Sequence, residues 1–329
     1  MRPLRDRVTI REVAADAGLS ISTVSRALSG ARPVTPGIAE KVRESAERLG
    51  YRVDSIGRSL RTQRTDTLGL VIPDITNPFF PALIQAIEHA ARARGLGIVI
   101  ADADNDPQIE RIALRTLIDQ RVDAVLISPT DLTASLDGLR DAAGRIPVIQ
   151  VDRVIDEELP HIRIDQTSPI EQLVAHLRAS GRRHLTFVGQ QPTVATSLER
   201  ERAFARVMAD AFPREPLRIL PGGTSALSGR EAARQVVEQW PLTDAIVCAN
   251  DLIGVGVLQE LGAEPGRRAI AVSGFDDTLL AHAVQLTSVK QPVDELARAA
   301  VSAAVGARQD GEPVRAVFTS EVVFRRSTE

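Results

Sequence analysis

Residues 9–29, TIREVAADAGLSISTVSRALS, decide how the first part of this chain folds. Thr9 is followed three residues later by Glu12, which is the reciprocal capping box that starts a helix. Gly18 permits a tight turn after that helix, and Ser20 is placed to cap a second one. The stretch therefore predicts two short helices joined by a glycine-containing turn.

The second predicted helix, residues 21–28, has two unlike faces. Val24 faces inward. The opposite face is polar and consists of Ser22, Ser25, Arg26 and Ser29. With a third helix predicted over residues 36–49, the pattern suits a helix-turn-helix whose second helix enters the major groove of DNA. Arg26 would then bind guanine with its forked donors. A structural three-helix bundle is the alternative.

Charge is distributed unevenly along the 329 residues, of which 43% are apolar and 25% are charged. Residues 1–64 contain thirteen Lys or Arg and seven Asp or Glu, a net charge of +6, whereas the remainder carries −9. A basic head on an acidic body suggests that the head meets a polyanion, but chance clustering on a solvated helix gives the same count. The composition excludes disordered, collagen-like and disulfide-rich classes.

After residue 64 the sequence alternates short apolar runs with helical stretches. The runs occupy residues 68–72, 97–100, 124–127, 148–151, 185–188, 245–248 and 269–272. Runs of this kind, buried on both faces and separated by helices, indicate parallel sheets of the doubly wound type. This part of the chain, about 265 residues, exceeds one comfortable core. The sequence therefore predicts a small all-α head and an α/β body of two doubly wound parallel-sheet lobes.

Motifs along nearly the whole chain resemble one family. Residues 8–30 are similar to the head of the lactose/galactose-repressor (LacI/GalR) family of bacterial transcription regulators. Further matches, in the family's order, are Asn77-Pro78-Phe79-Phe80, Val151-Asp152-Arg153, Ala249-Asn250-Asp251, Gly274-Phe275-Asp276-Asp277 and residues 286–292. The head motif is highly specific, and the later motifs are weak singly but strong together. The resemblance implies a body like that of periplasmic binding proteins.

By this resemblance the head reads DNA sequence in the major groove. Ile21 and Ser22 hold the two positions that choose bases, and Arg26 is the guanine reader. Ile21 has two open interpretations, a contact with a thymine methyl group or a place at the edge of the core. The candidate phosphate contacts, which position the head without specifying sequence, are Thr9, Ser20, Thr23, Ser25 and Arg32.

Residues 54–62 resemble the family's hinge helix, whose leucine, here Leu60, is wedged into a minor-groove step and bends the duplex. The chain departs from the family pattern, because Val53-Asp54 replace Pro-Asn and Gly57 replaces Ala. Glycine costs about 1 kcal/mol of helix stability relative to alanine. We therefore expect a hinge that is more disordered without DNA than in typical relatives. A plain flexible linker is the alternative.

Polar residues follow the ends of the predicted strands of the body. They are Asp74, Asn77, Asp152, Asn250, Asp251 and Asp276. Ligands of doubly wound lobes sit beyond the carboxyl ends of the strands, so these residues together predict a binding site. Carboxylates and amides for hydroxyl groups, with Phe79 as a flat apolar wall, suit a sugar, a polyol or a nucleoside. Each residue taken singly is also a typical turn or N-cap residue.

The resemblance assigns effector contacts at matching positions. They are Phe79, Asp152, Thr196, Arg200, Asn250 and Asp276. Arg202 lies close to Arg200, so an error of register is the alternative there. Thr224 stands where relatives place an aromatic residue, and Val194 stands where purine-binding members carry Arg. Both departures weaken the case for a purine and favour a small sugar-like effector.

Catalysis and metal binding find little support in the sequence. There is no phosphate loop, no Gly-x-Ser-x-Gly elbow and no His-Glu-x-x-His helix, and the five histidines show no ligand spacing. Residues 102–106 hint at a calcium loop but lack its later ligands, so we expect them to end a strand and cap a helix near Pro107. No cofactor or metal is predicted.

The sequence also bears on where the protein acts. The single cysteine, Cys248, fits a reducing cytosol. Residues 1–7 lead into no apolar stretch, so we expect no secretory signal peptide, and no apolar run is long enough to span a membrane. We therefore expect a cytoplasmic bacterial protein with no membrane partner.

Together these patterns predict a sequence-specific DNA-binding regulator, a repressor rather than an enzyme, which binds a pseudo-palindromic operator as a homodimer. The resemblance implies dimerisation through helices near residues 81–94 and 108–119. An effector in the cleft would change lobe closure and so operator affinity, with the sign left open. Alternatives are an exported solute-binding protein, which the added head argues against, and a sugar-modifying enzyme.

The predicted domain boundaries follow from the same patterns. The head is residues 1–53, the hinge is 54–64 and the body is 65–329. Within the body, the N-lobe takes residues 65–162 and 291–319, and the C-lobe takes 163–290 and 320–329.

Overall fold

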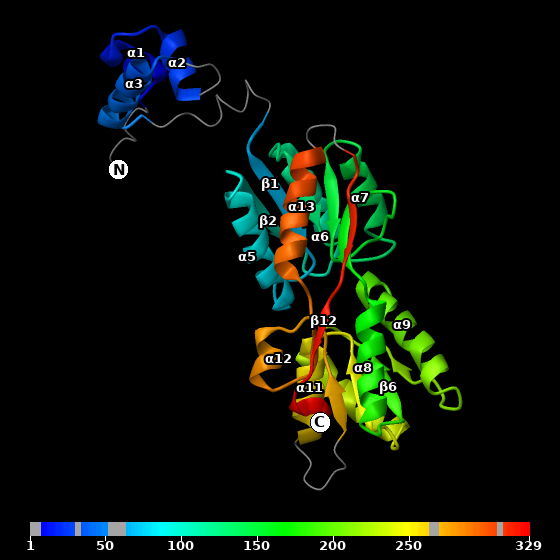
Figure 1. The fold of residues 1–329 in the computed structure, drawn as a ribbon. Helices are drawn as coiled ribbons and strands as arrows, with labels where there is room; N and C mark the ends of the chain where they lie inside the picture. Colours follow the sequence, from blue (N-terminus) through cyan, green and yellow to red (C-terminus); the bar gives the residue numbers. More distant parts are fainter. Residues whose placement is uncertain (1–7, 30–33, 52–63, 263–269, 308–311) are drawn as a thin grey trace, which may run out of the picture. The chain divides into compact units, whose positions relative to one another are not determined.

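The structure is a computed structural model that describes residues 8–29, 34–51, 64–262, 270–307 and 312–329. The chain divides into two compact units, Met1–Thr65 and Asp66–Glu329. The first unit contains the predicted head and the predicted hinge, and the second corresponds to the body. Figure 1 shows the helices of the first unit and the sheet-containing lobes of the second. Arg32, Leu60 and the predicted hinge helix, residues 54–62, lie outside the described residues.

The described part of the head forms three helices, α1 (Ile10–Ala17), α2 (Ile21–Ser29) and α3 (Pro36–Leu49). Thr9 and Glu12 form the capping box, in which the Thr9 amide donates to Glu12 Oε2 over 2.6 Å. Gly18 ends α1 in the left-handed conformation with φ 62°. The helices enclose a small apolar core of Val13, Ala14, Val24, Val42 and Ala46. The predicted helices and turn are therefore confirmed.

The body is built on parallel sheets. Its strands are β1 (Thr67–Ile72), β2 (Gly97–Asp102), β3 (Ala124–Ile127), β4 (Val148–Val151), β5 (His161–Ile164), β6 (Leu185–Val188), β7 (Ile219–Leu220), β8 (Ala245–Cys248), β9 (Ala271–Ser273), β10 (Ser288–Lys290), β11 (Arg315–Phe318) and β12 (Glu321–Val323). The first lobe has a six-stranded sheet in the order β11-β5-β4-β3-β1-β2, and the second lobe has a four-stranded sheet in the order β7-β6-β8-β9. The strands β10 and β12 pair antiparallel as a separate ribbon.

Helices cover both faces of each sheet. They are α5 (Phe79–Arg92), α6 (Pro107–Asp119), α7 (Leu136–Ala143), α8 (Thr167–Ala179), α9 (Ala195–Ala211), α10 (Ala226–Gln239), α11 (Asp251–Gly262), α12 (Leu279–Ala283) and α13 (Val293–Ala307), followed by a 3-10 turn at Arg326–Thr328. In the first lobe, α5 packs with α13 and α6 packs with α7. In the second lobe the pairs are α8 with α9 and α10 with α11. This is the doubly wound architecture predicted for both lobes.

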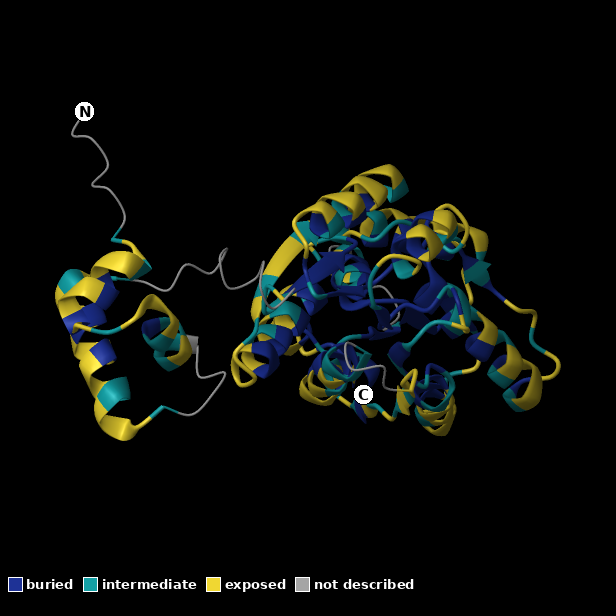
Figure 2. Cartoon of the chain, turned by 90° about the horizontal axis from the view of Figure 1, so that it is seen from above, coloured by how far each residue is buried: buried dark blue, intermediate teal, exposed yellow. Residues whose placement is uncertain are grey.

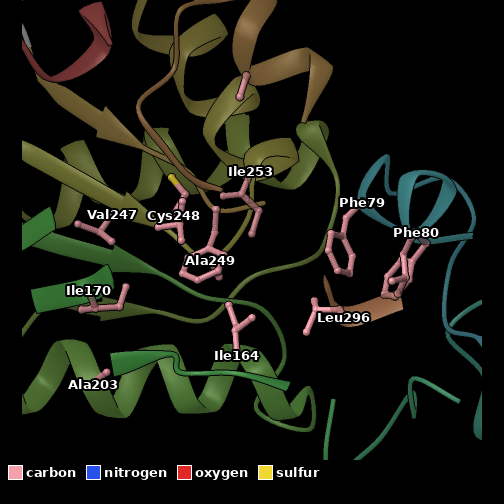
Figure 3. Packing of buried hydrophobic residues seen from close by; sticks show 14 of the residues in the cluster. Phe79, Phe80, Ile164, Ile170, Ala203, Val247, Cys248, Ala249, Ile253 and Leu296 are labelled. Atoms are coloured by element: carbon pink, nitrogen blue, oxygen red, sulfur yellow. The ribbon is translucent and has the colours of Figure 1, made fainter. Parts of the chain in front are cut away.

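Side chains alternate across the sheet of the first lobe. Leu70 of β1 belongs to one apolar cluster with Leu83 of α5, whereas its neighbour Val71 belongs to another with Leu117 of α6. The first cluster continues into the second lobe, and Figure 3 shows members from both lobes, including Phe79 and Leu296 from the first and Ile253 from the second. Figure 2 shows buried residues between the layers and exposed residues on the outer helix faces. The two lobes thus share one core.

The chain passes between the lobes three times. The crossovers lie between β5 and α8, between β10 and α13, and between β11 and β12. The first carries Gln166 and the second carries Gln291, and both side chains are buried. These crossovers place polar side chains at the boundary of the lobes.

One expectation about the strands is wrong. All seven predicted runs contain strands, but the run at residues 97–100 is not buried on both faces. It forms β2, which lies at the edge of its sheet, and Val99 and Ile100 are exposed. An edge strand has a neighbour on one side only, so its apolar side chains are covered less well.

None of the described helices is long and apolar enough to cross a lipid bilayer.

Candidate functional site

The exposed surface of α2 carries most of the residues predicted to contact DNA. Ser20 caps the helix by accepting a 3.1 Å hydrogen bond from the Thr23 amide, and its hydroxyl also lies 2.9 Å from that of Ser22. The Arg26 Nε donates to the Ser22 carbonyl oxygen over 3.3 Å, which lays the guanidinium along the helix. Ser20, Ser22 and Arg26 are exposed. Small polar residues beside one arginine allow a helix to approach base edges closely.

Ile21 is 46% exposed and is not among the residues that pack on the head core. Of its two interpretations, the structure therefore favours an outward side chain available for an apolar contact. Thr23 and Ser25 are half-buried on the same helix, and Thr9 is exposed at the start of α1. Phosphate contacts at these positions remain predictions.

In the body, Asp152 and Arg153 follow β4 directly and are both buried. Asp152 has φ 69° and Asp276, after β9, has φ 101°. Non-glycine residues in this region are strained, and such strain clusters at functional sites. The two aspartates that the sequence selected are thus held in unusual conformations at the carboxyl ends of strands from different lobes.

Arg200 on α9 joins these elements. Its Nε donates to Gln166 Oε1 over 2.8 Å, and its Nη1 donates to the Ala249 carbonyl oxygen over 2.5 Å. Its Nη2 lies 3.8 Å from Asp276 Oδ1. The guanidinium carbon also lies 3.4 Å from the centre of the Phe275 ring, a cation–π contact. Arg200, rather than the exposed Arg202, is therefore the arginine that belongs to this network of buried side chains.

Gln291 connects the carboxylates. Its Nε2 donates to Asp276 Oδ1 over 2.7 Å, and its side chain also stabilises the charged form of Asp152. Burial nevertheless raises the pKa of Asp152, and it raises the pKa of Asp276 to about 8 despite the attraction of Arg200. Burial likewise raises the pKa of Asp251 to about 6. This buried, charge-dense network adjoins a groove that Asp276 and Gln291 line, and the network and the groove together are called the cleft. Such environments are typical of binding and catalytic sites.

Four buried polar atoms around this network have no hydrogen-bond partner within the protein. Two are acceptors, Asp152 Oδ1 and Gln291 Oε1, and two are donors, Arg153 Nε and Gln166 Nε2. Buried polar groups are nearly always satisfied, so a group of unsatisfied ones marks a place for a ligand or water. A ligand with hydroxyl groups satisfies both kinds, because a hydroxyl donates and accepts.

Three other residues predicted to contact the effector, Phe79, Thr196 and Asn250, are buried. Phe79 is buried and lines a groove with a volume of about 820 Å³ together with Asp276 and Gln291. Thr196 is buried one turn before Arg200 on α9, on the same helix face. Asn250 is buried at the end of β8, where its Oδ1 accepts from the Ile253 amide over 2.8 Å and so caps α11.

Asp74 and Asn77 are hydrogen-bonded to the loops around them. Asp74 accepts hydrogen bonds from the amide and hydroxyl of Thr76 over 2.8 and 2.6 Å, and from Asn105 over 3.1 Å. Asn77 Oδ1 accepts from the Phe79 amide over 3.1 Å. These contacts are typical of turn and cap residues, and the effector contacts predicted for Asp74 and Asn77 remain predictions.

Three polar residues of the cleft were not selected from the sequence. Arg153 and Gln291 stand in matched motifs, and that position was the available signal. Gln166 gave no signal, because it follows β5, a strand that was not predicted.

Residues 102–106 end a strand and cap a helix, as expected from the sequence. The strand β2 ends at Asp102, and Asp106 caps α6 by accepting a hydrogen bond from the Gln108 amide over 2.7 Å.

No group of acidic, histidine or cysteine side chains suited to a metal ion occurs among the described residues. Cys248 is buried, and burial raises the pKa of its thiol.

The described part of the chain combines a helix-turn-helix head with a two-lobed body that holds a polar cleft. This combination defines a ligand-responsive DNA-binding regulator as a class.

Comparison with known proteins places the chain within that class. A family model for periplasmic binding proteins and the sugar binding domain of the LacI family matches residues 65–302, and a model for bacterial regulatory proteins of the lacI family matches residues 9–54. The chain belongs to the LacI family of bacterial regulatory proteins. It is accordingly a DNA-binding transcriptional regulator with a ligand-binding domain, and not an enzyme.

Individual relatives agree over the whole chain. The HTH-type transcriptional regulator CelR of Thermobifida fusca is 31% identical over 98% of this chain and 99% of its own length. A solved CelR–cellobiose complex is 28% identical over 98% of this chain and all of that chain, with a TM-score of 0.72. The lac repressor dimer bound to operator and an anti-inducer has a TM-score of 0.88 at 22% identity, over 98% of this chain and 99% of that one, and shows the shared fold.

Proposed function

We propose that this protein is a repressor that binds a pseudo-palindromic operator as a homodimer and responds to a small sugar-like effector in the cleft between the lobes of the body. The observation that carries the proposal is the presence, in one chain, of an exposed DNA-reading helix and a buried cleft with unsatisfied donors and acceptors.

The head supplies sequence choice. Ile21 and Ser22 offer base contacts at the start of α2, and Arg26 offers a forked donor for guanine one turn later. Thr9, Ser20, Thr23, Ser25 and Arg32 are the proposed phosphate contacts, and Leu60 is the proposed minor-groove wedge. A single head covers little DNA, so two heads related by a two-fold axis would read the two halves of the operator.

The cleft supplies effector binding. Asp152, Arg200 and Asp276 are the proposed polar contacts, with Thr196 and Asn250 beside them and Phe79 as the apolar wall. The relative solved with cellobiose supports a sugar as the class of effector. Asp74 and Asn77, in the loop before α5, are further proposed effector contacts.

Exposed apolar side chains support the homodimer. On the first lobe they include Ile75, Val99, Ile100, Ile109 and Ile112, and on the second lobe they include Leu227, Leu279, Leu280 and Val284. Ile109 and Ile112 project from α6, one of the two helices expected to form the interface. Grouped apolar residues on a surface mark interaction sites. The relative solved as an operator-bound dimer agrees with this assembly.

The proposed parts of the chain are a head of residues 1–53, a hinge of 54–64 and a body of 65–329, whose N-lobe takes 65–162 and 291–319 and whose C-lobe takes 163–290 and 320–329. We place the protein at the bacterial nucleoid in the cytoplasm, where its operator lies.

Selection of duplexes from a random pool by the full-length protein tests the proposal. We expect an enriched near-palindromic site, bound at two salt concentrations with a preference over random DNA, and a change in affinity when a sugar from a panel is added. Equal retention of every duplex, or turnover of a sugar, would overturn the proposal.

A further inference from the structure

A second pocket of the body lies outside the cleft, and we call it the flank pocket. It has a volume of about 430 Å³, and its lining includes residues 163–167, Glu199, Arg202, Arg206 and Val317. Residues 163–167 and Val317 belong to β5, the crossover after it and the edge strand β11, whereas the other residues belong to α9. Phe79, Asp152 and Asp276, which are proposed to hold the effector, are not among the described residues that line it. The flank pocket is therefore a separate hollow that both lobes form.

Three arginines line the flank pocket. Arg163 comes from β5 of the first lobe, and Arg202 and Arg206 stand one turn apart on α9 of the second lobe. Arg163 Nη1 lies 2.8 Å from Glu157 Oε1, and Arg206 Nη2 lies 3.1 Å from Glu171 Oε1. Both glutamate side chains are exposed, so these pairs are weak and a ligand can replace them. Arg202 is exposed and makes no ion pair with a described residue.

The lining of the flank pocket also contains two carboxyl groups, those of Asp165 and Glu199. Asp165 caps α8, because it accepts hydrogen bonds from the amides of Thr167 and Ser168 over 2.9 and 3.2 Å. Glu199 lies 3.8 Å from Arg163, and burial raises the pKa of its carboxyl, which disfavours the charged form. Three guanidinium groups and two carboxyl groups leave the lining positive, so it suits an anion.

Gln166 adds an unsatisfied donor to the lining. This residue is 4% exposed, and its Oε1 accepts from Arg200 Nε over 2.8 Å. Its Nε2 is buried and has no hydrogen-bond partner among the described residues. A buried donor without an acceptor costs free energy, so one at the wall of a pocket marks a place for an acceptor. The amide and the arginines thus ask for the same chemistry, that of an oxyanion.

We propose that the flank pocket is a second ligand site, which binds the phosphate group of a small anion. A phosphate group offers three strong acceptor oxygens and about two negative charges, and arginine forks bind it through paired N–H groups. A carboxylate offers two oxygens and one charge, and Glu157 and Glu171 already supply that chemistry to two of the arginines. Free phosphate and a phosphate ester share the recognised group, and the volume of the pocket admits either.

Titration of the full-length protein with inorganic phosphate and with glycerol phosphate, without DNA and at constant ionic strength, tests the proposal. Phosphorus NMR follows the bound fraction directly. We expect saturable binding of at least one of the two probes. Tighter binding of the ester would identify a phosphorylated metabolite as the ligand, and equal or weaker binding of the ester would identify free phosphate. Absence of saturable binding for both probes overturns the proposal.

Three variants make the result specific to the flank pocket. Arg202→Gln, at an exposed side chain that the fold does not need, should weaken phosphate binding roughly ten-fold, which is what one hydrogen bond to a charged group contributes. Glu199→Gln removes a carboxyl group from the lining and should strengthen binding several-fold. Arg145→Gln, at an exposed arginine 3.2 Å from Asp141, is the matched control and should leave the affinity unchanged.

The directions of these changes exclude binding elsewhere on the protein. Phosphate held by the basic head would not respond to a change at Arg202 or Glu199. Equal affinity of the wild type and Arg202→Gln, or weaker binding by Glu199→Gln, therefore overturns the proposal. Either result leaves the proposed regulator function standing, because the flank pocket is separate from the effector cleft.

Discussion

Near neutral pH, Asp276 carries a proton in the folded protein that it loses in the unfolded chain. Burial raises its pKa from the ordinary value of 3.8 to about 8. Between those two values the folded state binds more protons than the unfolded state, so the free energy of unfolding falls as pH rises, by as much as about 1.4 kcal/mol per unit. Asp251, with a pKa raised to about 6, adds to the fall with the same sign at lower pH.

Asp276→Asn should flatten this dependence, since an amide does not titrate. Urea unfolding of the wild type and the variant at several values between about pH 5 and about pH 9 measures the slope directly. Glu158→Gln, at an exposed side chain, should keep the wild-type slope. A wild-type stability that climbs steadily to about pH 8 would contradict the assignment.

Arg26 should specify one base. Its side chain lies on the exposed face of α2, and a bidentate contact with guanine is worth roughly 1–3 kcal/mol of discrimination. Arg26→Ala should weaken binding to the selected operator by that amount and relax the choice at one position, as measured by gel shift on single-base operator variants. Arg43→Ala, which breaks an exposed ion pair with Glu40, should lower the affinity for all DNA sequences equally or leave it unchanged. Equal loss on every duplex from Arg26→Ala would place Arg26 on phosphate instead.

The sequence predicted cleft residues where a motif and a strand end coincided. Asp152 and Asp276 were found in this way, Arg200 was assigned from the family resemblance alone, and the structure brings the three together. Gln166 was missed because only the folded chain brings its crossover next to Arg200. The positive φ angles of Asp152 and Asp276 could not be predicted either, because a positive φ is expected at glycine and is uncommon at aspartate.

At the scale of elements, the contact between α10 and α11 depends on two glycines. A Cβ atom at Gly256 would lie 1.9 Å from the Ala226 carbonyl oxygen, and one at Gly229 would lie 2.2 Å from that of Ile253. Neither neighbour is a movable side-chain end, so the helices would have to separate. Overpacking of a core costs about 1–3 kcal/mol, and a collision with backbone costs at least as much.

Gly256→Ala should therefore lower the stability of the body by more than about 1 kcal/mol, measured by urea unfolding. Gly262→Ala, in the last turn of the same helix, is the matched control, because nothing lies within 4 Å of its Cβ position. That change should be neutral or slightly stabilising, since alanine favours a helix over glycine. Equal stability of the two variants would show that the helices are not in the close contact described.

Element prediction succeeded where apolar runs were continuous and failed where they were interrupted. The run at residues 124–127 became β3, buried throughout. The strand β5 escaped notice because His161 and Arg163 break its apolar pattern, although His161 is buried beside a carbonyl oxygen of Leu159. The two-residue strand β7 is too short for any pattern. Whether such a segment forms a strand depends on its position in the sheet, and the composition of the segment alone does not reveal that position.

At the scale of the whole molecule, the proposed dimer depends on the outer face of α6. Ile112→Glu places a charge on a side chain that is 62% exposed, so the body should still fold while self-association weakens. Sedimentation velocity should then show a monomer at concentrations where the wild type is a dimer, with a matching loss of operator affinity. Leu242→Glu, at an equally exposed leucine before β8, is the control and should remain dimeric. A dimeric Ile112→Glu variant would move the interface elsewhere.

The two lobes also meet outside the crossovers. The Leu132 amide, in the loop after β3, donates over 2.9 Å to the Thr193 carbonyl oxygen, in the loop after β6. The neighbouring Asp131 accepts from the amides of Thr133 and Ala134, each over 2.8 Å, and Thr193 further lowers the pKa of its carboxyl. The same first-lobe loop is held by Glu110 of α6 through Thr130. A change in lobe closure that separates these two loops breaks this contact.

Locking that contact should remove the response to the effector. In a Leu132→Cys, Thr193→Cys variant the two backbones are close enough for a disulfide, and the native Cys248 is buried and does not compete. The reduced protein should respond to a bound sugar within the usual allosteric range of about 5- to 150-fold in operator affinity. The oxidised protein should hold one affinity with or without sugar, because closure is fixed. Gel shifts with and without reductant measure this, with Leu132→Cys alone as control. An oxidised double variant that still responds fully would separate operator control from lobe closure.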